Sequence, residues 1–335
     1  MKTRPRDARP GRRAALALVL LGVISAIVAF NPAGATTRIR EKDINLDIAR
    51  RVQARLVAAG VPVYMTRTSD KTVTLAQRTS GANSRRVDVF VSIHNNASSN
   101  RSAGGTEVYR QIHSSASALL AENLRSVLSR SPGLRTSVHA RTGDHGDYYY
   151  QLRTTKMPAV IVEGAYVTNP REARLLASAA FRQKLADSIA AGILAYQRSL
   201  VARPLPATAT PTRVIVPALP APSGASGRAV NSRTVSLDWD LGATGATYNV
   251  YRNRTLIGTV KTPVLSTLSD PGRVSFTDIW AAPGQRYTYE IASAVQPGSV
   301  SLESAPARLT VRTPPIFVAL DPGHGGRDPG AGGSY

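Results

Sequence analysis

Hydrophobic residues between positions 36 and 200 follow two different spacings. Ile44, Ile48, Val52 and Leu56 recur every fourth residue, which predicts a helix with one buried face that ends near Gly60. Other stretches are almost continuously apolar and rich in β-branched residues, which is typical of strands covered on both faces; they are 87–93 and 159–162. Shorter strands are predicted at 61–65 and 106–110, and further helices at 75–86, 115–128 and 171–200. Strands interleaved with helices predict an α/β fold with a mostly parallel sheet flanked by helices.

The pattern changes after position 200. Residues 201–227 are rich in proline, alanine, threonine and serine, and we expect an extended linker without a core of its own. Residues 228–313 contain short alternating segments separated by turns, such as 235–239, 248–251 and 287–291, which predict a second, small all-β sandwich domain. The placement of its Trp and Tyr residues resembles a fibronectin type III domain, and we expect these aromatic side chains to fill the core.

The first 35 residues have the order of segments found in secretory signals. Basic residues up to Arg13 precede a mainly apolar run from Ala14 to Phe30, and Ala33-Gly34-Ala35 offers a site for cleavage. We therefore expect residues 1–35 to be a signal peptide, the mature chain to be secreted to the cell wall or periplasm, and no stable membrane insertion after cleavage. A retained anchor is the alternative, because the apolar run is near the lower limit of a membrane span.

The amino-acid composition limits the kinds of site and partner that the chain can have. The chain has no cysteine, which excludes disulfides, thiolate metal sites and a cysteine nucleophile. Its net charge of +21 indicates an anionic partner, although an arginine-rich composition can also reflect a GC-rich genome. Nucleic acid is not favoured as that partner, because the chain looks exported and carries no recognisable nucleic-acid-binding motif.

Residues able to bind a metal follow several of the predicted elements. His94 and Glu163 come at the ends of buried strands, and a further apolar run, 316–320, leads to a glycine-rich segment with His324. Glu41 lies at the start of the first long helix. In a parallel sheet these positions meet at one edge. Two histidines and one glutamate can form a zinc site with a fourth position open to water, and another carboxylate can act as a base.

Several motifs resemble the zinc-dependent N-acetylmuramoyl-L-alanine amidases of bacterial cell walls. They are Asp321-Pro-Gly-His-Gly-Gly326, Arg40-Glu-Lys-Asp43, Ser92-Ile-His-Asn-Asn96, Gly104-Gly-Thr-Glu-Val-Tyr109, the segment 152–160 and the segment 162–169. The resemblance implies that His324, Glu41 and His94 bind Zn²⁺ and that Glu163 is the catalytic carboxylate. It also implies hydrolysis of the amide between N-acetylmuramic acid and L-alanine in peptidoglycan.

Two further residues are candidates for substrate binding. Arg153 and Asn96 belong to the same motifs, and a structural ion pair is the alternative for Arg153. The expected partners are peptidoglycan and other anionic wall polymers. We expect His113, His139 and His145 to be exposed residues without a role in metal binding.

The order of the motifs departs from the family. The segment 314–335, with its Asp-Pro-Gly-His motif, follows the predicted sandwich here, whereas in the family it precedes the Arg-Glu-Lys-Asp motif. We therefore expect a circular permutation in which 314–335 supplies the first strand of the catalytic domain of residues 36–200. The alternatives are the start of a second, truncated amidase domain or a misplaced piece of sequence. Either would leave a non-catalytic wall-binding protein with an incomplete amidase domain.

Overall fold

The computed structural model of the chain describes residues 38–201, 211–243, 245–262, 272–295 and 300–335. The predicted signal peptide, 1–35, and part of the predicted linker lie outside these ranges. Residues 38–201 and 316–335 form an α/β body, and most of the remaining described residues form a β-sandwich with a separate core. Across the described ranges, we find no helix that combines the length and the apolar character needed to cross a bilayer.

The α/β body contains a six-stranded sheet with the order β2-β18-β3-β8-β4-β5. The strands β2, β18, β3 and β8 run parallel, β4 is antiparallel to β8, and β5 is parallel to β4. This mostly parallel sheet confirms the predicted fold class. The strands are β2 Val63–Met65, β18 Val318–Pro322, β3 Val89–Asn96, β8 Ala159–Tyr166, β4 Thr106–Arg110 and β5 Thr136–His139.

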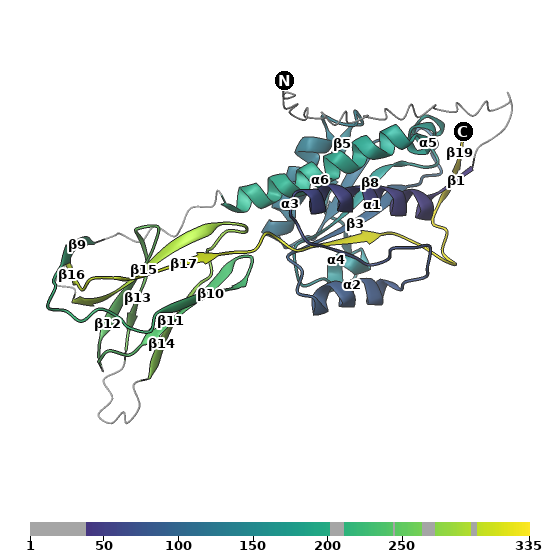
Figure 1. Cartoon of the computed structure of the whole chain (residues 1–335). Coiled ribbons are helices and arrows are strands. Elements are labelled where there is room, and N and C mark those ends of the chain that lie inside the picture. Colours follow the sequence, from purple (N-terminus) through teal and green to yellow (C-terminus); the bar gives the residue numbers. More distant parts are fainter. Residues whose placement is uncertain (1–37, 202–210, 244, 263–271, 296–299) are drawn as a thin grey trace, which may run out of the picture. The chain divides into compact units, whose positions relative to one another are not determined.

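Helices cover both faces of this sheet (Figure 1). The core on one face includes residues of α1, α3, α5 and α6, and a smaller core on the other includes residues of α2 and α4. Successive side chains of a strand point to opposite faces, so Val89, Val91 and Ile93 enter the first core and Phe90 enters the second. The helices are α1 Glu41–Ala58, α2 Leu75–Ser84, α3 Ser115–Leu128, α4 Tyr150–Thr154, α5 Pro170–Ala177 and α6 Ala179–Val201.

Strand β18 comes late in the chain but occupies an inner position of the sheet. It pairs with β2 on one side, with Val318 opposite Val63, and with β3 on the other, with Leu320 opposite Val91. Val318, Ala319 and Leu320 are fully buried. The segment 314–335 therefore completes the sheet formed by the earlier residues.

Two small ribbons lie outside the main sheet. In the first, β1 (Arg38–Arg40) pairs antiparallel with β19 (Gly332–Ser334), with Arg38 opposite Ser334. Residues near the first and last described positions are thus neighbours. The second ribbon joins β6 (Thr142–Gly143) to β7 (Gly146–Asp147).

The sandwich consists of a three-stranded sheet, β10-β11-β14, and a six-stranded sheet, β13-β12-β15-β16-β9, in which β17 also pairs with β15. Its core is rich in aromatic residues, as expected from the sequence: Trp239, Tyr248 and Tyr289 are almost fully buried. The strands are β9 Thr212–Ile215, β10 Ser226–Asn231, β11 Thr234–Asp240, β12 Thr247–Arg252, β13 Thr255–Lys261, β14 Arg273–Asp278, β15 Arg286–Val295, β16 Val300–Glu303 and β17 Ala307–Arg312.

The interpretation of 201–227 as linker throughout needs correction. Within it, β9 pairs parallel with β16, and Arg213 donates hydrogen bonds to Glu303 (2.7 Å) and Glu290 (2.8 Å). Prolines flank β9 rather than interrupt it, and β9 is the outermost strand of its sheet, where neighbouring proline is tolerated. The proline content concealed a short β-branched segment that can join a sheet.

Candidate metal centre

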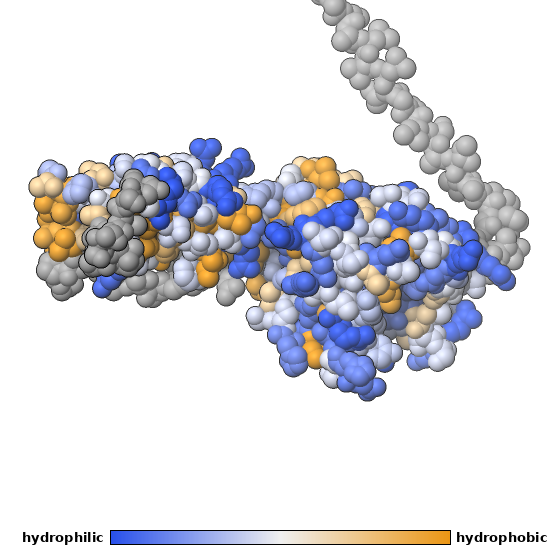
Figure 2. Space-filling model, turned by 90° about the horizontal axis from the view of Figure 1, so that it is seen from below, coloured by the Kyte–Doolittle hydropathy of each residue, from blue (hydrophilic) through white to orange (hydrophobic). Residues whose placement is uncertain are grey.

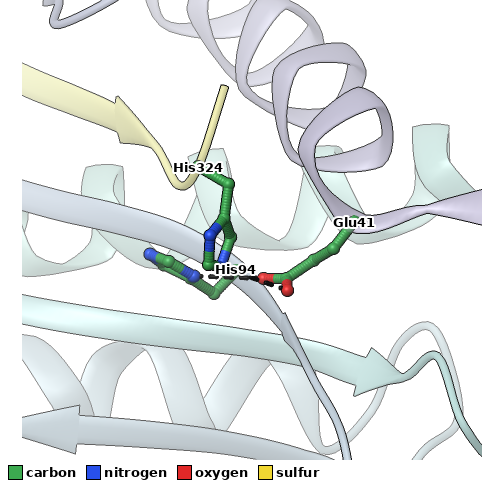
Figure 3. A group of neighbouring side chains, drawn as sticks. All are labelled: Glu41, His94 and His324. Atoms are coloured by element: carbon green, nitrogen blue, oxygen red, sulfur yellow. Dashed lines mark hydrogen bonds and ion pairs between the residues drawn. The ribbon is translucent and has the colours of Figure 1, made fainter. Parts of the chain in front are cut away.

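Three predicted metal ligands meet at the carboxyl edge of the parallel strands (Figure 3). Glu41 is the first residue of α1, His94 lies near the end of β3, and His324 follows β18. One carboxylate oxygen of Glu41 lies 3.1 Å from His94 Nδ1, and the other lies 3.2 Å from His324 Nε2. One ligand atom from each residue lies within 4.8 Å of the others, a spacing that fits a single ion.

Two buried arginines hold the turn that carries His324. The Arg67 guanidinium donates to the carbonyls of Pro322 (2.8 Å) and Gly323 (2.8 Å), and that of Arg78 donates to the carbonyl of His324 (2.7 Å). These bonds hold His324 in a left-handed conformation, φ +58°, which is unfavourable for a residue with a side chain. At Gly323, a Cβ atom would approach the His94 ring to 2.1 Å, so only glycine fits between the two ligands.

The end of β18 is anchored by Asp321. Its carboxylate is fully buried, pairs with Arg78 at 2.6 Å, and accepts hydrogen bonds from Thr66 (2.6 Å) and Ser92 (2.7 Å). Burial opposes ionisation, but Arg78 and the two hydroxyl groups outweigh it and keep the pKa of Asp321 below its usual range. This ionised anchor ties β18 to α2, β2 and β3, and so fixes the position of His324.

A shell of hydrogen bonds orients the three ligands. The Asn45 amide (3.1 Å) and the Asn95 backbone N–H (3.2 Å) donate to one oxygen of Glu41, and the Ala331 N–H donates to the other (2.9 Å). Asp328 lies 2.7 Å from His324 Nδ1, which leaves Nε2 facing Glu41. Carboxylate–histidine pairs of this kind are common around metal sites, where they fix the ring and its tautomer.

The charges of the three side chains are strongly coupled. Burial opposes ionisation of Glu41, but the two histidines outweigh it and hold its pKa well below the usual range. Burial also disfavours the charged form of His324, yet Glu41 and then Asp328 raise its pKa to about 9. The pKa of His94 is raised as well, because Glu41 and Glu163 outweigh its burial. Without a cation, the raised pKa values of both histidines favour their charged forms beside the buried Glu41 carboxylate.

The donor set fits a zinc ion. Two imidazoles and one carboxylate with an open fourth position match the ligands of hydrolytic zinc sites. His94 Nε2 is buried and has no hydrogen-bond partner, which is unusual for a polar atom unless another group engages it. A divalent cation would supply positive charge beside the buried Glu41 carboxylate.

Zinc affinity is therefore expected to rise with pH. His324 remains protonated up to about pH 9 in the metal-free protein, and zinc must displace that proton. Between pH 6 and 8 we expect the apparent association constant to increase about tenfold per pH unit for each proton displaced. Calorimetry in two buffers of different ionisation enthalpy measures both the affinity and the proton release. A pH-independent affinity in the wild type, or the same slope in His324→Ala as in the exposed control His113→Ala, would contradict this coupling.

Glu163 lies beside the three ligands. It is the register partner of His94 across the parallel pair β3 and β8. Burial raises the pKa of Glu163 to about 7, and Glu41 and Glu107 act in the same direction while His94 opposes them. Its Oε2 atom is buried without a hydrogen-bond partner. The side chain can thus gain and release a proton near neutral pH, as a general base must.

A second carboxylate, Glu107, lies opposite Glu163 in the antiparallel pair β4 and β8. Three groups donate to it: Tyr109 Oη (2.7 Å), Tyr166 Oη (2.9 Å) and the Asn96 amide (3.1 Å). The amide of Asn96, predicted to bind substrate, is therefore engaged within the fold. The network keeps Glu107 as an acceptor of hydrogen bonds beside Glu163.

The other predicted residues lie apart from the ligands. Arg153 is exposed, donates to the Asp147 carbonyl (2.7 Å) and forms no ion pair with any described carboxylate, so its role in substrate binding stays a prediction. His113, His139 and His145 are exposed, as expected.

A cavity of about 400 Å³ opens over the site. His94 and His324 line it, together with Gln151 of α4 and the segment 72–75. A substrate group can therefore approach the two histidine ligands from this side. A Glu/His/His group with a neighbouring carboxylate and an adjacent cavity fits the chemistry of a metal-dependent hydrolase.

Comparisons with known proteins match this chain to amidases. A sequence profile described as N-acetylmuramoyl-L-alanine amidase matches residues 29–195. The amidase LytC of Bacillus subtilis is 36% identical over 160 residues, which cover 47% of this chain and 31% of LytC. The uncharacterized protein YqiI of Bacillus subtilis is 35% identical over 161 residues, 47% of this chain and 74% of YqiI. The catalytic domain of CwlV, an N-acetylmuramoyl-L-alanine amidase of Paenibacillus polymyxa, shares 34% identity over 47% of this chain and 85% of that domain, with a TM-score of 0.43.

This chain belongs to the N-acetylmuramoyl-L-alanine amidase family. The profile match ends before β18, although the structure brings β18 into the same sheet.

Sequence patterns did not reveal the residues that hold the ligands in place. Arg78 and Asn45 lie on helices whose hydrophobic spacing was recognised, and Arg67 lies two residues beyond β2. The spacing does not say what a polar side chain contacts. For Asp321 and Asp328 a signal was available, since both flank His324 within eight residues of sequence. Glu107 was part of a recognised motif, and its position opposite Glu163 depends on strand pairing.

Proposed function

We propose that this protein is a secreted peptidoglycan hydrolase that cleaves the amide bond between N-acetylmuramic acid and the L-alanine of the stem peptide. The observation that carries the proposal is the group of Glu41, His94 and His324 beside Glu163, an unpaired carboxylate with a pKa of about 7. Membership of the amidase family supports the choice of substrate. The chain from Thr36 has a net charge of +16, because residues 1–35 hold six of the 42 basic and one of the 21 acidic side chains, and this charge favours contact with peptidoglycan and other anionic wall polymers.

In this proposal Glu41, His94 and His324 hold one Zn²⁺ ion. When bound, the ion supplies a Lewis acid that polarises the scissile carbonyl group and makes water a better nucleophile at neutral pH. Asn45, Asn95 and Ala331 orient Glu41 through their hydrogen bonds.

Glu163 carries the proton transfers. As a carboxylate it accepts a proton from the attacking water, and as a carboxylic acid it delivers this proton to the amine of the departing L-alanine. Its raised pKa makes both steps accessible near pH 7. Its Oε2 atom has no hydrogen-bond partner among the described residues, so no bond within the fold has to break before it accepts a proton.

We further propose that the α/β body is a circularly permuted amidase domain. The inner position of β18 and the pairing of β1 with β19 support this order, because a short connection between β19 and β1 would restore the family sequence. The sandwich then acts as a fibronectin type III-like spacer or wall-contacting module between α6 and β18. The mature protein acts in the cell wall or periplasm.

A digest of purified peptidoglycan tests the activity. The full chain with zinc is expected to release stem peptides with a free N-terminal alanine and to leave intact glycan strands, as identified by mass spectrometry. Removal of zinc with a chelator is expected to abolish the release, and added zinc to restore it. Binding to peptidoglycan without any release would show a non-catalytic wall-binding protein instead.

A further inference from the structure

A second cavity, of about 590 Å³, lies at the same edge of the sheet and has no role in the chemistry described above. Its walls include Arg38 and Arg40 of β1, Arg101 and Ser98 of the segment after β3, and Thr168 after β8. We call it the arginine cavity. Figure 2 shows that hydrophilic residues predominate on the face of the α/β body seen there.

Residues that line the arginine cavity are neighbours in sequence of residues at the metal centre. Arg40 directly precedes Glu41, and Gly332, which also lines the cavity, follows Ala331, whose N–H donates to Glu41. Ser98 and Thr168 lie just beyond the strands that carry His94 and Glu163. The walls of the cavity thus continue, within a few residues, from the elements that carry Glu41, His94 and Glu163.

The lining carries positive charge only. Ile39 is buried in the core, so the alternation along β1 turns Arg38 and Arg40 to the opposite side together. Arg40 shares an exposed ion pair with Asp43 (2.7 Å), which screens it weakly. Arg38 and Arg101 have no ion-pair partner among the described residues, and no carboxylate lines the cavity.

Two hydroxyl groups add donors to the same walls. Thr168 Oγ1 accepts the Ser98 N–H (3.0 Å), and Ser98 Oγ accepts the Asn100 N–H (3.1 Å). Each hydroxyl already accepts a bond from the backbone, so its own hydrogen remains able to donate. Guanidinium and hydroxyl donors around one space suit an anion with several acceptor oxygens, such as a carboxylate.

We propose that the arginine cavity binds a carboxylate of the stem peptide, close to the amide that is cleaved. The proposal rests on the function proposed above and adds a substrate preference to it. The residue that follows L-alanine in bacterial stem peptides is a glutamate linked through its side chain, so its α-carboxylate is free unless it is amidated. Peptides with the free α-carboxylate are the preferred substrates, and amidated peptides bind less well.

The test compares two muropeptides that differ only in amidation of this α-carboxyl group. For the wild-type full chain we expect a KM about tenfold lower for the free carboxylate, with similar kcat. The double variant Arg38→Gln/Arg101→Gln is expected to bind both peptides equally, with unchanged kcat and zinc content. The matched control Arg85→Gln/Arg130→Gln removes two exposed arginines elsewhere and is expected to keep the preference.

A measurement of peptide binding without hydrolysis tests this inference independently of the proposed function. Calorimetry of both peptides with the zinc-free full chain reports the preference without hydrolysis. Equal binding of the two peptides, with hydrolysis of both, overturns the inference and leaves the amidase function intact. The inference is also overturned if the Arg38→Gln/Arg101→Gln variant still prefers the peptide with the free carboxylate. It is overturned as well if glycerol phosphate polymer competes with both peptides and amidation has no effect, a result that would assign the cavity to wall phosphates. A carboxylate preference without hydrolysis supports the cavity and overturns the amidase function.

Discussion

Replacement of Glu163 by glutamine is expected to lower the rate of amide hydrolysis by about 10²- to 10⁴-fold, the usual contribution of a general base. Glutamine has nearly the same shape but accepts no proton from water. The pKa of about 7 also predicts that wild-type activity falls on the acidic side of neutrality, where Glu163 is protonated. A bound cation lowers this pKa, so the acidic limb of the profile lies at or below pH 7 in the zinc-loaded enzyme. The measurement is the initial rate of release of N-terminal alanine from pH 5 to 9.

Folding and zinc content are expected to survive this substitution. The raised pKa means that ionisation of Glu163 above pH 7 destabilises the metal-free fold, since an unfolded glutamate ionises more readily. Glu163→Gln is therefore expected to melt no lower than the wild type at pH 8. Glu122→Gln, which alters an exposed residue of α3, is the matched control and keeps full activity. Activity within twofold of the wild type in Glu163→Gln would remove Glu163 from the mechanism.

Removal of residues 314–335 is expected to abolish both zinc binding and the cooperative unfolding of the α/β body. The truncated chain loses β18, whose residues Val318, Ala319 and Leu320 are fully buried between β2 and β3. It also leaves Arg78 buried without Asp321, and an unpaired buried charge is strongly destabilising. The measurements are thermal unfolding, zinc content and the peptidoglycan digest.

The truncation removes both a metal ligand and a strand, and a point variant tests the effect of losing the ligand alone. His324→Ala in the full chain keeps β18 and is expected to remain folded while its zinc affinity falls about 100-fold or more, because even loss of a residue that only orients a ligand commonly costs 10- to 100-fold. His113→Ala, at an exposed site, is the control and keeps normal zinc affinity. A truncated chain that folds and binds zinc like the wild type would contradict the role of 314–335.

The elements of the α/β body could be predicted because each has a strong local pattern. Helix α3 and strand β4 have the predicted bounds, and α1 follows the spacing of Ile44, Ile48, Val52 and Leu56. The meeting of Glu41, His94 and His324 was predictable for a similar reason, since parallel strands bring their carboxyl ends to one edge.

The hydrogen bonds and the strand pairing that the sequence did not predict depend on contacts between residues far apart in the chain. The hydrogen bond between Ser92 and Asp321 joins positions 229 residues apart, and no local pattern encodes it. The same holds for the bonds of Arg67 and for the pairing of β9 with β16, which the surrounding prolines concealed. Asn96 had a recognisable motif, but its amide comes within reach of Glu107 only because β3 and β4 both pair with β8.

The place of β18 in the chain also determines when the site can be assembled during biosynthesis. A ribosome completes Glu41 and His94 long before His324, and the strands of the sandwich emerge in the interval. Until β18 follows them, the sheet has a gap between β2 and β3 and the metal group lacks a histidine. The complete metal group, and with it the proposed hydrolytic activity, can therefore form only after the sandwich has been made.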